Sequence, residues 1–156
     1  MQKGFLIAVE GVDGSGKSTL TEHLTKRFRA EYPEVGVRQT ADPEGTATAR
    51  LVKAWIDSED DLADETTMLL IAAARKENCD KVISPALERG EIVITDRWLL
   101  STLVYFCKDN KWMIRLANQI HGETCDNVNP HFTLVLSCDP GHAKRRLAVR
   151  LSLIHI

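Results

Sequence analysis

The sequence predicts an α/β fold in which a parallel sheet lies between layers of helices. Short apolar segments alternate with helical stretches along the chain, and strands as apolar as these are buried on both faces, as in parallel sheets. A glycine-rich loop joins the first apolar segment to the first helical stretch. With 156 residues, of which 44% are hydrophobic, the chain is long enough for one domain with a hydrophobic core.

The first half of the chain is expected to contain two strands and three helices. The apolar segment Phe5–Val9 predicts a buried strand, which leads through the glycines into a helix over Lys17–Ala30. A second short strand is expected at Val35–Thr40, followed by a helix over Ala47–Asp57. The next helix, Ala63–Glu88, begins with an acidic turn, which suits a helix N-terminus, and ends before a glycine.

The second half continues the alternation. Glu91–Thr95 predicts another buried strand, and one long helical region is expected to follow it as far as His121. The polar, proline-containing stretch Asn127–Pro130 predicts a loop, after which His131–Ser137 forms a strand. A last helix is expected to begin after Pro140.

Composition and charge exclude several classes of protein. The formal net charge of −2 is too small to predict binding to a nucleic acid or to a membrane surface. The four cysteines are far apart and contain no C-x-x-C pair, which predicts reduced thiols without a disulfide or a zinc site. The N-terminal apolar run is too short for a signal peptide, and no segment has transmembrane length. We therefore expect a cytoplasmic protein.

The glycine-rich loop matches the P-loop pattern G-x-x-x-x-G-K-[ST] over Gly11–Ser18, between an expected strand and an expected helix. In such a loop, backbone N–H groups and the helix N-terminus surround a polyphosphate, and the glycines let the backbone approach it. Lys17 supplies a cation to the β- and γ-phosphates, and the Ser18 hydroxyl can bind magnesium. The expected nucleotide-phosphate site comprises Gly11, Val12, Asp13, Gly14, Ser15, Gly16, Lys17, Ser18 and Thr19.

A P-loop alone is compatible with a GTPase, a motor protein, a nucleoside kinase or a nucleoside monophosphate kinase. The sequence has no N-K-x-D guanine motif, which disfavours a GTPase. Five segments resemble the thymidylate (dTMP) kinases of bacteria and phages in order and approximate spacing: EGVDGSGKST, ADPEGT (41–46), AAAR (72–75), ISPALERG (83–90) and DRWLLSTLVY (96–105). The resemblance implies the three-layer P-loop NTPase fold of nucleoside monophosphate kinases. It also implies transfer of the ATP γ-phosphate to dTMP, with ATP and Mg²⁺ as cofactors.

The resemblance assigns catalytic and metal-binding roles. Asp13 matches an acidic residue that approaches the acceptor sugar and the bound ion, and Arg97 matches an arginine on the phosphates being joined. Together with Lys17, these two residues form the expected catalytic set. Asp96 is expected to hold Mg²⁺ through water, with Ser18 and Asp13 as the other metal residues. Phosphoryl transfer needs such cations to bring two negatively charged groups together, and it needs no protein nucleophile.

The resemblance also implies a site for the acceptor nucleotide. Arg75 matches the arginine that reads the edge of thymine, and Tyr105 matches a tyrosine that crowds the sugar 2′ position and so favours deoxyribose. The expected substrate residues are Asp42, Ile71, Arg75, Arg97, Ser101, Thr102 and Tyr105. Considered singly, Arg75 is also compatible with a surface salt bridge. Tyr105 and Trp98 are compatible with core aromatic residues, and Asp96-Arg97 with a simple ion pair at a strand end.

Several positions depart from the family pattern. Ala41 replaces an arginine that contacts the acceptor phosphate, and Ile71 replaces a phenylalanine that stacks on thymine. Gly14 replaces the P-loop arginine of eukaryotic members, so the catalytic arginines are expected from a lid that begins at Arg146 and Arg150. These departures leave two other functions open: a P-loop deoxynucleoside or deoxynucleotide kinase with another base preference, and a nucleotide-binding relative without catalysis.

The C-terminal end is expected to be incomplete. We assign residues 1–150 to a P-loop kinase domain that stops at the start of the lid, because the family continues into a further strand and helix. The residues LSLIHI (151–156) match the translation of a transposon adapter used in sequencing libraries and are expected to be a non-native tail. The complete protein is expected to be a homodimer, and the present chain to transfer phosphate poorly and to aggregate through an unpaired sheet edge.

Overall fold

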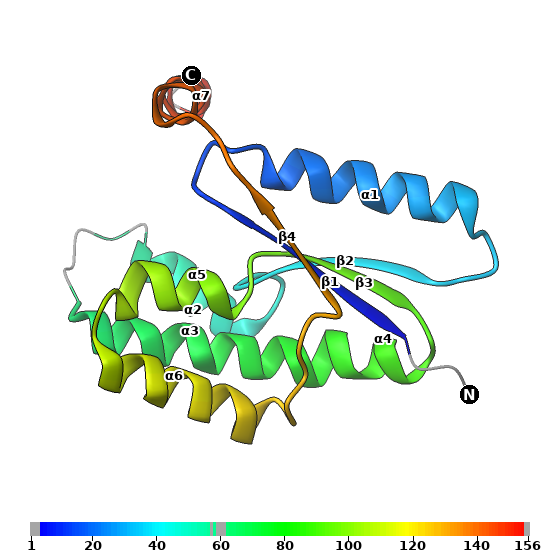
Figure 1. The fold of residues 1–156 in the computed structure, drawn as a ribbon, viewed down its shortest axis with the longest axis horizontal. Coiled ribbons are helices and arrows are strands. Elements are labelled where there is room, and N and C mark those ends of the chain that lie inside the picture. The colour runs from blue at the N-terminus through cyan, green and yellow to red at the C-terminus, as the bar shows by residue number, and fades with distance from the viewer. Residues whose placement is uncertain (1–3, 57, 59–61, 155–156) are drawn as a thin grey trace.

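The computed structural model describes residues 4–56, 58 and 62–154, and these form a three-layer α/β fold around a parallel sheet (Figure 1). The four strands lie in the order β2-β3-β1-β4. They are β1 (Phe5–Gly11), β2 (Val37–Ala41), β3 (Ile92–Asp96) and β4 (Phe132–Leu136). Val9 of β1 pairs with Asp96, and Ala41 of β2 pairs with the same residue, so the carboxyl ends of three strands meet at one edge. The predicted fold class is confirmed.

The two central strands are buried on both faces, as their apolar sequences predict. Leu6 and Ala8 of β1 pack with Val93 of β3 on one face, and Val9 packs with Ile94 on the other. The same prediction is wrong for β4. Phe132 and Val135 are 57% and 64% exposed, because β4 forms the edge of the sheet and the described helices do not cover it.

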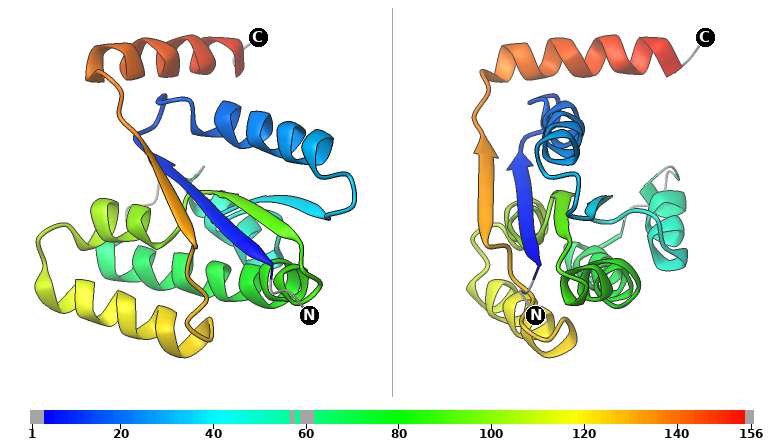
Figure 2. Two further views of the ribbon diagram at one scale, coloured as in Figure 1. Left: turned by 45° about the vertical axis from the view of Figure 1, so that its right-hand side comes forward. Right: turned by 90° about the vertical axis from the view of Figure 1, so that its right-hand side faces the viewer.

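Within the described residues, one face of the sheet is covered by a single helix. This helix, α1 (Lys17–Glu31), contacts β1, β2 and β3 and lies along one side of the sheet (Figure 2). Its apolar residues Leu20, Leu24 and Phe28 pack against the strands at a spacing of about one helical turn, which is why one side of the helix faces the sheet. Its N-terminus lies at the carboxyl end of β1, where the glycine-rich loop connects the two elements.

The opposite face is covered by three consecutive helical segments, where the sequence predicts one helix over Ala63–Glu88. They are α3 (Asp64–Asn78), a π-helical segment η1 (Cys79–Ile83) and α4 (Ser84–Glu88). The last segment ends where predicted, and Ile83 and Ala86 pack against β1 and β3. The wider π turn of η1 inserts an extra residue between α3, which lines the site, and α4, which covers the sheet.

The long helix expected up to His121 is interrupted. The chain instead forms α5 (Leu99–Thr102), a π-helical segment η2 (Leu103–Cys107) and, after a turn, α6 (Lys111–Thr124). Lys108 has a φ of 48° and donates its N–H to Leu103 O, which ends the first segment. The reversal lets Met113 and Ala117 of α6 pack against Met68 of α3, and this tertiary contact outweighs the local preference for a continuous helix.

Two further helices flank the carboxyl edge of the sheet. In α2 (Ala47–Ile56), the Thr48 N–H donates to Glu77 of α3 over 2.7 Å, so a side chain from another helix caps the first turn. The last element, α7 (Pro140–Ile154), follows β4 and runs past the glycine-rich loop (Figure 2). Across the described parts of the chain, none of the helices combines the length and the apolar character that crossing a membrane requires.

Candidate active site

The glycine-rich loop between β1 and α1 has the backbone conformation that its sequence predicts. Gly14 and Gly16 have φ values of 80° and 100°, which residues with side chains rarely adopt. Gly16 precedes the first residue of α1, so the unpaired N–H groups of the helix N-terminus lie at the loop. The loop is therefore shaped to surround an anionic group.

Lys17 is buried, with only 6% of its surface exposed. Its ammonium donates to Val12 O over 2.9 Å and lies 3.6 Å from the carboxylate of Asp13. Burial and the charge of Arg97 lower the pKa of Lys17, and the carboxylates of Asp13 and Asp96 offset part of this effect. The loop itself thus holds the cation in place.

Asp96 ends β3 beside the first turn of α1. The Ser18 hydroxyl donates to Asp96 Oδ2 over 2.7 Å, and Asp96 Oδ1 is buried without a hydrogen-bond partner. Two of the three residues expected at a magnesium site, Ser18 and Asp96, are therefore in direct contact. The described residues contain no cluster of three or more His, Cys, Asp or Glu side chains that could hold a metal on its own.

Arg97 forms its ion pair with Asp13 of the P-loop and not with its neighbour Asp96, so the simple ion-pair interpretation is wrong. One of its nitrogens, Nη1, donates to Ser101 Oγ over 3.0 Å, and its guanidinium lies over the ring of Tyr105 at 5.4 Å. The backbone of Arg97 has a φ of 72°, which is uncommon for a residue with a side chain. Arg97 thus connects the P-loop to the helical segment that follows β3.

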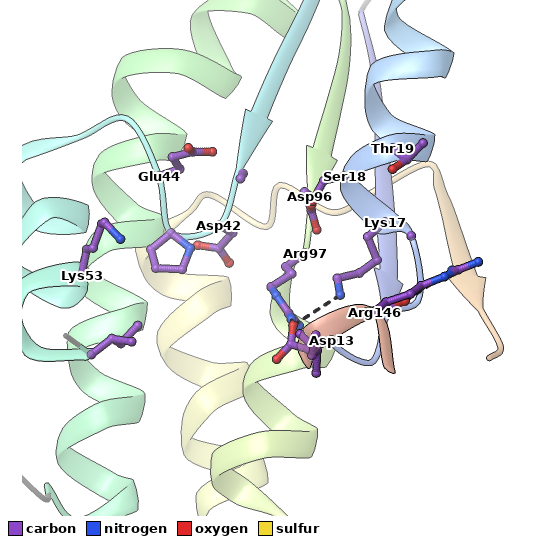
Figure 3. Close-up of a pocket in the computed structure, with 16 residues that line it drawn as sticks. Asp13, Lys17, Ser18, Thr19, Asp42, Glu44, Lys53, Asp96, Arg97 and Arg146 are labelled. Carbon is purple, nitrogen blue, oxygen red and sulfur yellow. Dashed lines mark hydrogen bonds and ion pairs between the residues drawn. The ribbon is translucent and has the colours of Figure 1, made fainter. Parts of the chain in front are cut away.

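These residues line a cleft of about 530 Å³ at the carboxyl edge of the sheet (Figure 3). Lys17 and Arg146 lie on one wall, and Lys53 of α2 lies on the opposite wall beside Glu44. Of the expected nucleotide residues, Asp13, Gly14, Gly16, Lys17, Ser18 and Thr19 line this cleft, whereas Gly11, Val12 and Ser15 do not. Val12 contributes its carbonyl to Lys17, and the hydroxyl of Ser15 is buried without a partner.

A second pocket of about 220 Å³ lies beside the cleft and contains every residue expected at the substrate site. Arg75 projects into it from α3 and is 2% exposed, which excludes the surface salt-bridge interpretation. Its Nε donates to Asp42 Oδ2 over 2.5 Å, and its Nη2 donates to Thr102 Oγ1 over 2.6 Å. Burial raises the pKa of Asp42, and the Arg75 guanidinium offsets part of that rise.

The rest of the second pocket is largely apolar. Ile71, Trp98 and Phe106 line it together with Tyr105. Tyr105 is 39% exposed, so the interpretation of this residue as a core aromatic is wrong, whereas Trp98 is buried and packs against Arg75 at 5.6 Å. The pocket therefore combines a flat apolar lining with a fixed guanidinium.

Five residues line both cavities: Asp13, Asp42, Pro43, Ile56 and Arg97. The phosphate-binding cleft and the apolar pocket consequently share one wall. Groups bound in the two cavities can meet at Asp13 and Arg97, at the edge of the sheet where the strands end.

Of the two arginines expected in the lid, the structure describes the side chain of Arg146 alone. Arg146 of α7 lines the cleft, and its Nη1 lies 3.4 Å from Gly14 O. The side chain of Arg150 lies outside the described residues. Ala143, one turn before Arg146, packs so closely on the P-loop that a Cβ at Gly14 would lie 2.4 Å from Ala143 O.

Sequence reasoning missed three residues that shape the site. Glu10 is buried behind the Arg97–Ser101 segment and accepts hydrogen bonds from it. Asn78 binds the end of β2 through Ala41 O at 3.2 Å, which positions the following Asp42. Lys53 lines the cleft from a helix without a recognised motif. Only Glu10 had a signal in the sequence: it lies in an apolar strand, and a buried carboxylate needs hydrogen-bond donors because burial without them is costly.

The chain is similar to known proteins in sequence and in fold. A protein-family model described as "Thymidylate kinase" matches residues 9–153. The thymidylate kinase of Mycoplasma genitalium is 33% identical over 150 residues, which cover 96% of this chain and 71% of the relative. That of Cereibacter sphaeroides is 38% identical over 152 residues, covering 96% and 69%. The crystal structure of thymidylate kinase from Ehrlichia chaffeensis superposes with a TM-score of 0.80 at 28% identity, over 97% of this chain and 86% of that one.

Proposed function

The chain belongs to the thymidylate kinase family, and we propose that it transfers the γ-phosphate of ATP to dTMP, giving ADP and dTDP. The observation that carries this proposal is the wall shared by the phosphate-binding cleft and the apolar pocket. A kinase of this type must bring the phosphates of two nucleotides into line. Arg97 and Asp13 stand where the two nucleotides would meet.

The proposed chemistry is a direct displacement. An oxygen of the dTMP phosphate attacks the γ-phosphorus of ATP, and the bond from that phosphorus to the β–γ bridging oxygen breaks. No covalent intermediate on the protein is needed, so the protein acts by positioning and by stabilising charge. Lys17 and the N–H groups of the P-loop hold the ATP phosphates, and the Arg97 guanidinium offsets the charge that accumulates between donor and acceptor.

Asp13 prepares these cations. It pairs with both Lys17 and Arg97, so each of these charges has a counterion near the cleft. Bound phosphates provide competing negative charge and would draw the two cations toward the transferring group. The carboxylate of Asp13 is then free to face the sugar of the acceptor or a bound ion.

Magnesium fits the residues at the end of β3. Asp96 has a buried oxygen without a partner, and the hydroxyl of Ser18 lies beside it. Oxygen ligands of this kind suit Mg²⁺, which in kinases takes few ligands from the protein and the rest from phosphate and water. When bound, the ion would neutralise charge on the β- and γ-phosphates. Ser18 and Asp96 would orient it from one side, with Asp13 close to the same phosphates.

The second pocket is suited to a pyrimidine nucleotide. Thr102 and Asp42 fix the Arg75 guanidinium by two hydrogen bonds, so it can present its remaining donor surface to a carbonyl at the edge of the base. Ile71 and Phe106 provide apolar contact, and Tyr105, a partly exposed lining residue, is available to contact the sugar. Lys53, on the wall of the cleft near Ala41, supplies a cation for the acceptor phosphate where the family pattern has an arginine.

A coupled assay of ADP release with a panel of acceptors tests the proposal. We expect turnover with dTMP that exceeds turnover with dUMP, dCMP, dGMP and thymidine. A preference for another deoxynucleotide or for a nucleoside would favour the related kinase that Ile71 and Ala41 leave open. Binding of ATP and dTMP without ADP release would instead favour a non-catalytic relative and would contradict the proposal.

We propose three further properties, each supported by a feature of this chain. We propose a homodimer that forms through the helical layers, because Leu51 of α2, Leu69 of α3 and Trp112 of α6 are exposed apolar side chains. The cysteines, all four free, support a cytoplasmic location. Arg146 supports the assignment of α7 to the start of a lid that closes on ATP and excludes water.

A further inference from the structure

We infer that Glu10 is a positioning residue for phosphoryl transfer, because its buried carboxylate fixes the segment that carries Arg97. This inference rests on the function proposed above. Glu10 lies near the end of β1 and is 2% exposed. It is not among the residues that line the cleft or the pocket, so it acts on the substrates through Arg97 and not by contact.

Three donors converge on the Glu10 carboxylate. Its Oε1 accepts the backbone N–H of Trp98 at 2.9 Å and that of Ser101 at 3.2 Å, and its Oε2 accepts the Ser101 hydroxyl at 2.6 Å. Trp98 precedes the first residue of α5, a position whose side chain usually caps the helix, and here it makes no such bond. A carboxylate from the neighbouring strand therefore caps this helix in its place.

The same contacts determine how Ser101 meets Arg97. A serine hydroxyl has one proton to donate, and Ser101 gives it to Glu10. The lone pairs of its oxygen are thereby left for Arg97 Nη1, which donates to them over 3.0 Å. Glu10 thus fixes Ser101 as the acceptor of Arg97 Nη1, and Arg97 donates separately through Nη2 to Asp13.

The backbone of Arg97 also depends on this anchor. Its φ of 72° belongs to a region that is unfavourable for a residue with a side chain, so the surrounding contacts must hold it. The Arg97 N–H donates to Val9 O at 2.9 Å, and Arg97 O accepts from Thr95 Oγ1 at 3.0 Å. Glu10 fixes the residues on the other side of the turn, so that the guanidinium leaves β3 toward the wall shared by the two cavities.

The substitution Glu10→Gln tests this role with little change in size. All three partners of Glu10 are donors, and the amide NH₂ of glutamine would face one of them as a second donor. We expect kcat to fall about 10- to 100-fold, the effect of a displacement of about 1 Å in a group that positions the reaction. The affinity for ATP, measured by calorimetry without acceptor, should change little because the Glu10 carboxylate hydrogen-bonds to Trp98 and Ser101 and not to the P-loop N–H groups.

Glu91→Gln is the matched control. Glu91 is also a poorly exposed glutamate that accepts hydrogen bonds, from Arg89 and Arg38, but it lies just before β3 at the opposite end of that strand. Its replacement should lower the free energy of unfolding without lowering kcat. Ser101→Ala combined with Glu10→Gln should cost less than the sum of the two single effects, since both act on Arg97. Equal kcat for Glu10→Gln and Glu91→Gln would overturn the inference.

A crystal structure of the Glu10→Gln variant provides a readout that does not depend on activity. We expect the Arg97 guanidinium to leave Ser101 and Asp13. An unchanged Arg97 would overturn the inference even if kcat had fallen. Absence of ADP release from the unmodified chain with every acceptor would contradict the proposed function alone, and this structure would still decide the role of Glu10. If Glu10→Gln does not fold, Glu10→Asp, which keeps an acceptor-only group, answers the same question by both measurements.

Discussion

The buried pair of Arg75 and Asp42 leads to a prediction of unequal effects from the two partners. Both side chains are almost fully buried, at 2% and 1% exposure, and Nε lies 2.5 Å from Oδ2. Removing one member of such a pair leaves the other charge buried and typically costs about 3–5 kcal/mol. For a chain of this length that loss corresponds to a decrease in Tm on the order of 10 °C.

The two substitutions differ because only one partner can neutralise itself. In Asp42→Asn the guanidinium stays charged at every accessible pH, so the full cost remains. In Arg75→Met the remaining carboxylate can take up a proton, since burial raises the pKa of Asp42 and the offsetting guanidinium is gone. We therefore expect Asp42→Asn to be the more destabilising change at low pH.

The sign of the pH dependence follows from linkage. A carboxyl whose pKa is higher in the folded state binds more protons when folded, so folding gains stability as the pH falls through the folded pKa toward the unfolded value. Denaturant unfolding followed by circular dichroism between pH 8 and pH 5 should show Arg75→Met recovering part of its loss, while Asp42→Asn does not. Losses below about 1 kcal/mol, or the same pH dependence in both variants, would refute the interpretation of a buried ion pair.

Three other predictions concern the P-loop, the sugar and a helix cap. Lys17→Ala should abolish ADP release and leave Tm close to that of the unmodified chain, because burial disfavours the charged ammonium, as the lowered pKa of Lys17 indicates, and its removal therefore costs little stability. Lys76→Ala is the surface control. Near-normal turnover by Lys17→Ala would contradict the P-loop assignment. Tyr105→Ala should raise the rate with ribonucleotides relative to deoxyribonucleotides, and Tyr105→Phe should not; an unchanged ratio in the alanine variant would remove Tyr105 from sugar selection. Hydrogen bonds from Lys81 and Thr48 hold the pKa of Glu77 below its ordinary value of 4.5, so this carboxylate contributes stability above that pH and loses it as the pH falls further. The difference in unfolding free energy between Glu77→Gln and the unmodified chain should therefore shrink on acidification below about pH 4.5, and a constant difference would show that the cap does not depend on charge.

Local patterns predicted those parts of the molecule that local physics determines. The P-loop was predictable because its glycines, Lys17 and Ser18 are contiguous, and the central strands because their apolar runs allow only burial. The interruption at Lys108 was not predictable in this way. The sequence around it is compatible with a helix, and only the packing of α6 against α3 selects the turn.

The site shows the same division. Motifs identified Asp96, Arg97 and Arg75, yet the partners of these residues come from distant parts of the chain. Asp13 is 84 residues from Arg97, and Glu10 is 91 residues from Ser101. Which acid pairs with which base depends on the register of β1 and β3 and on the path of the following turn. A single sequence contains no direct signal for either.

The contact between α7 and the P-loop restricts how this enzyme can be redesigned. A side chain at position 14 would be strained by the φ of 80° and would collide with Ala143 O at 2.4 Å. The arginine that eukaryotic members carry at this position therefore cannot be grafted here while α7 occupies its place. Arg146, from that same helix, reaches the cleft instead. A P-loop arginine and a docked α7 are mutually exclusive in this chain, and chimeras with eukaryotic relatives should exchange the loop and the helix as one unit.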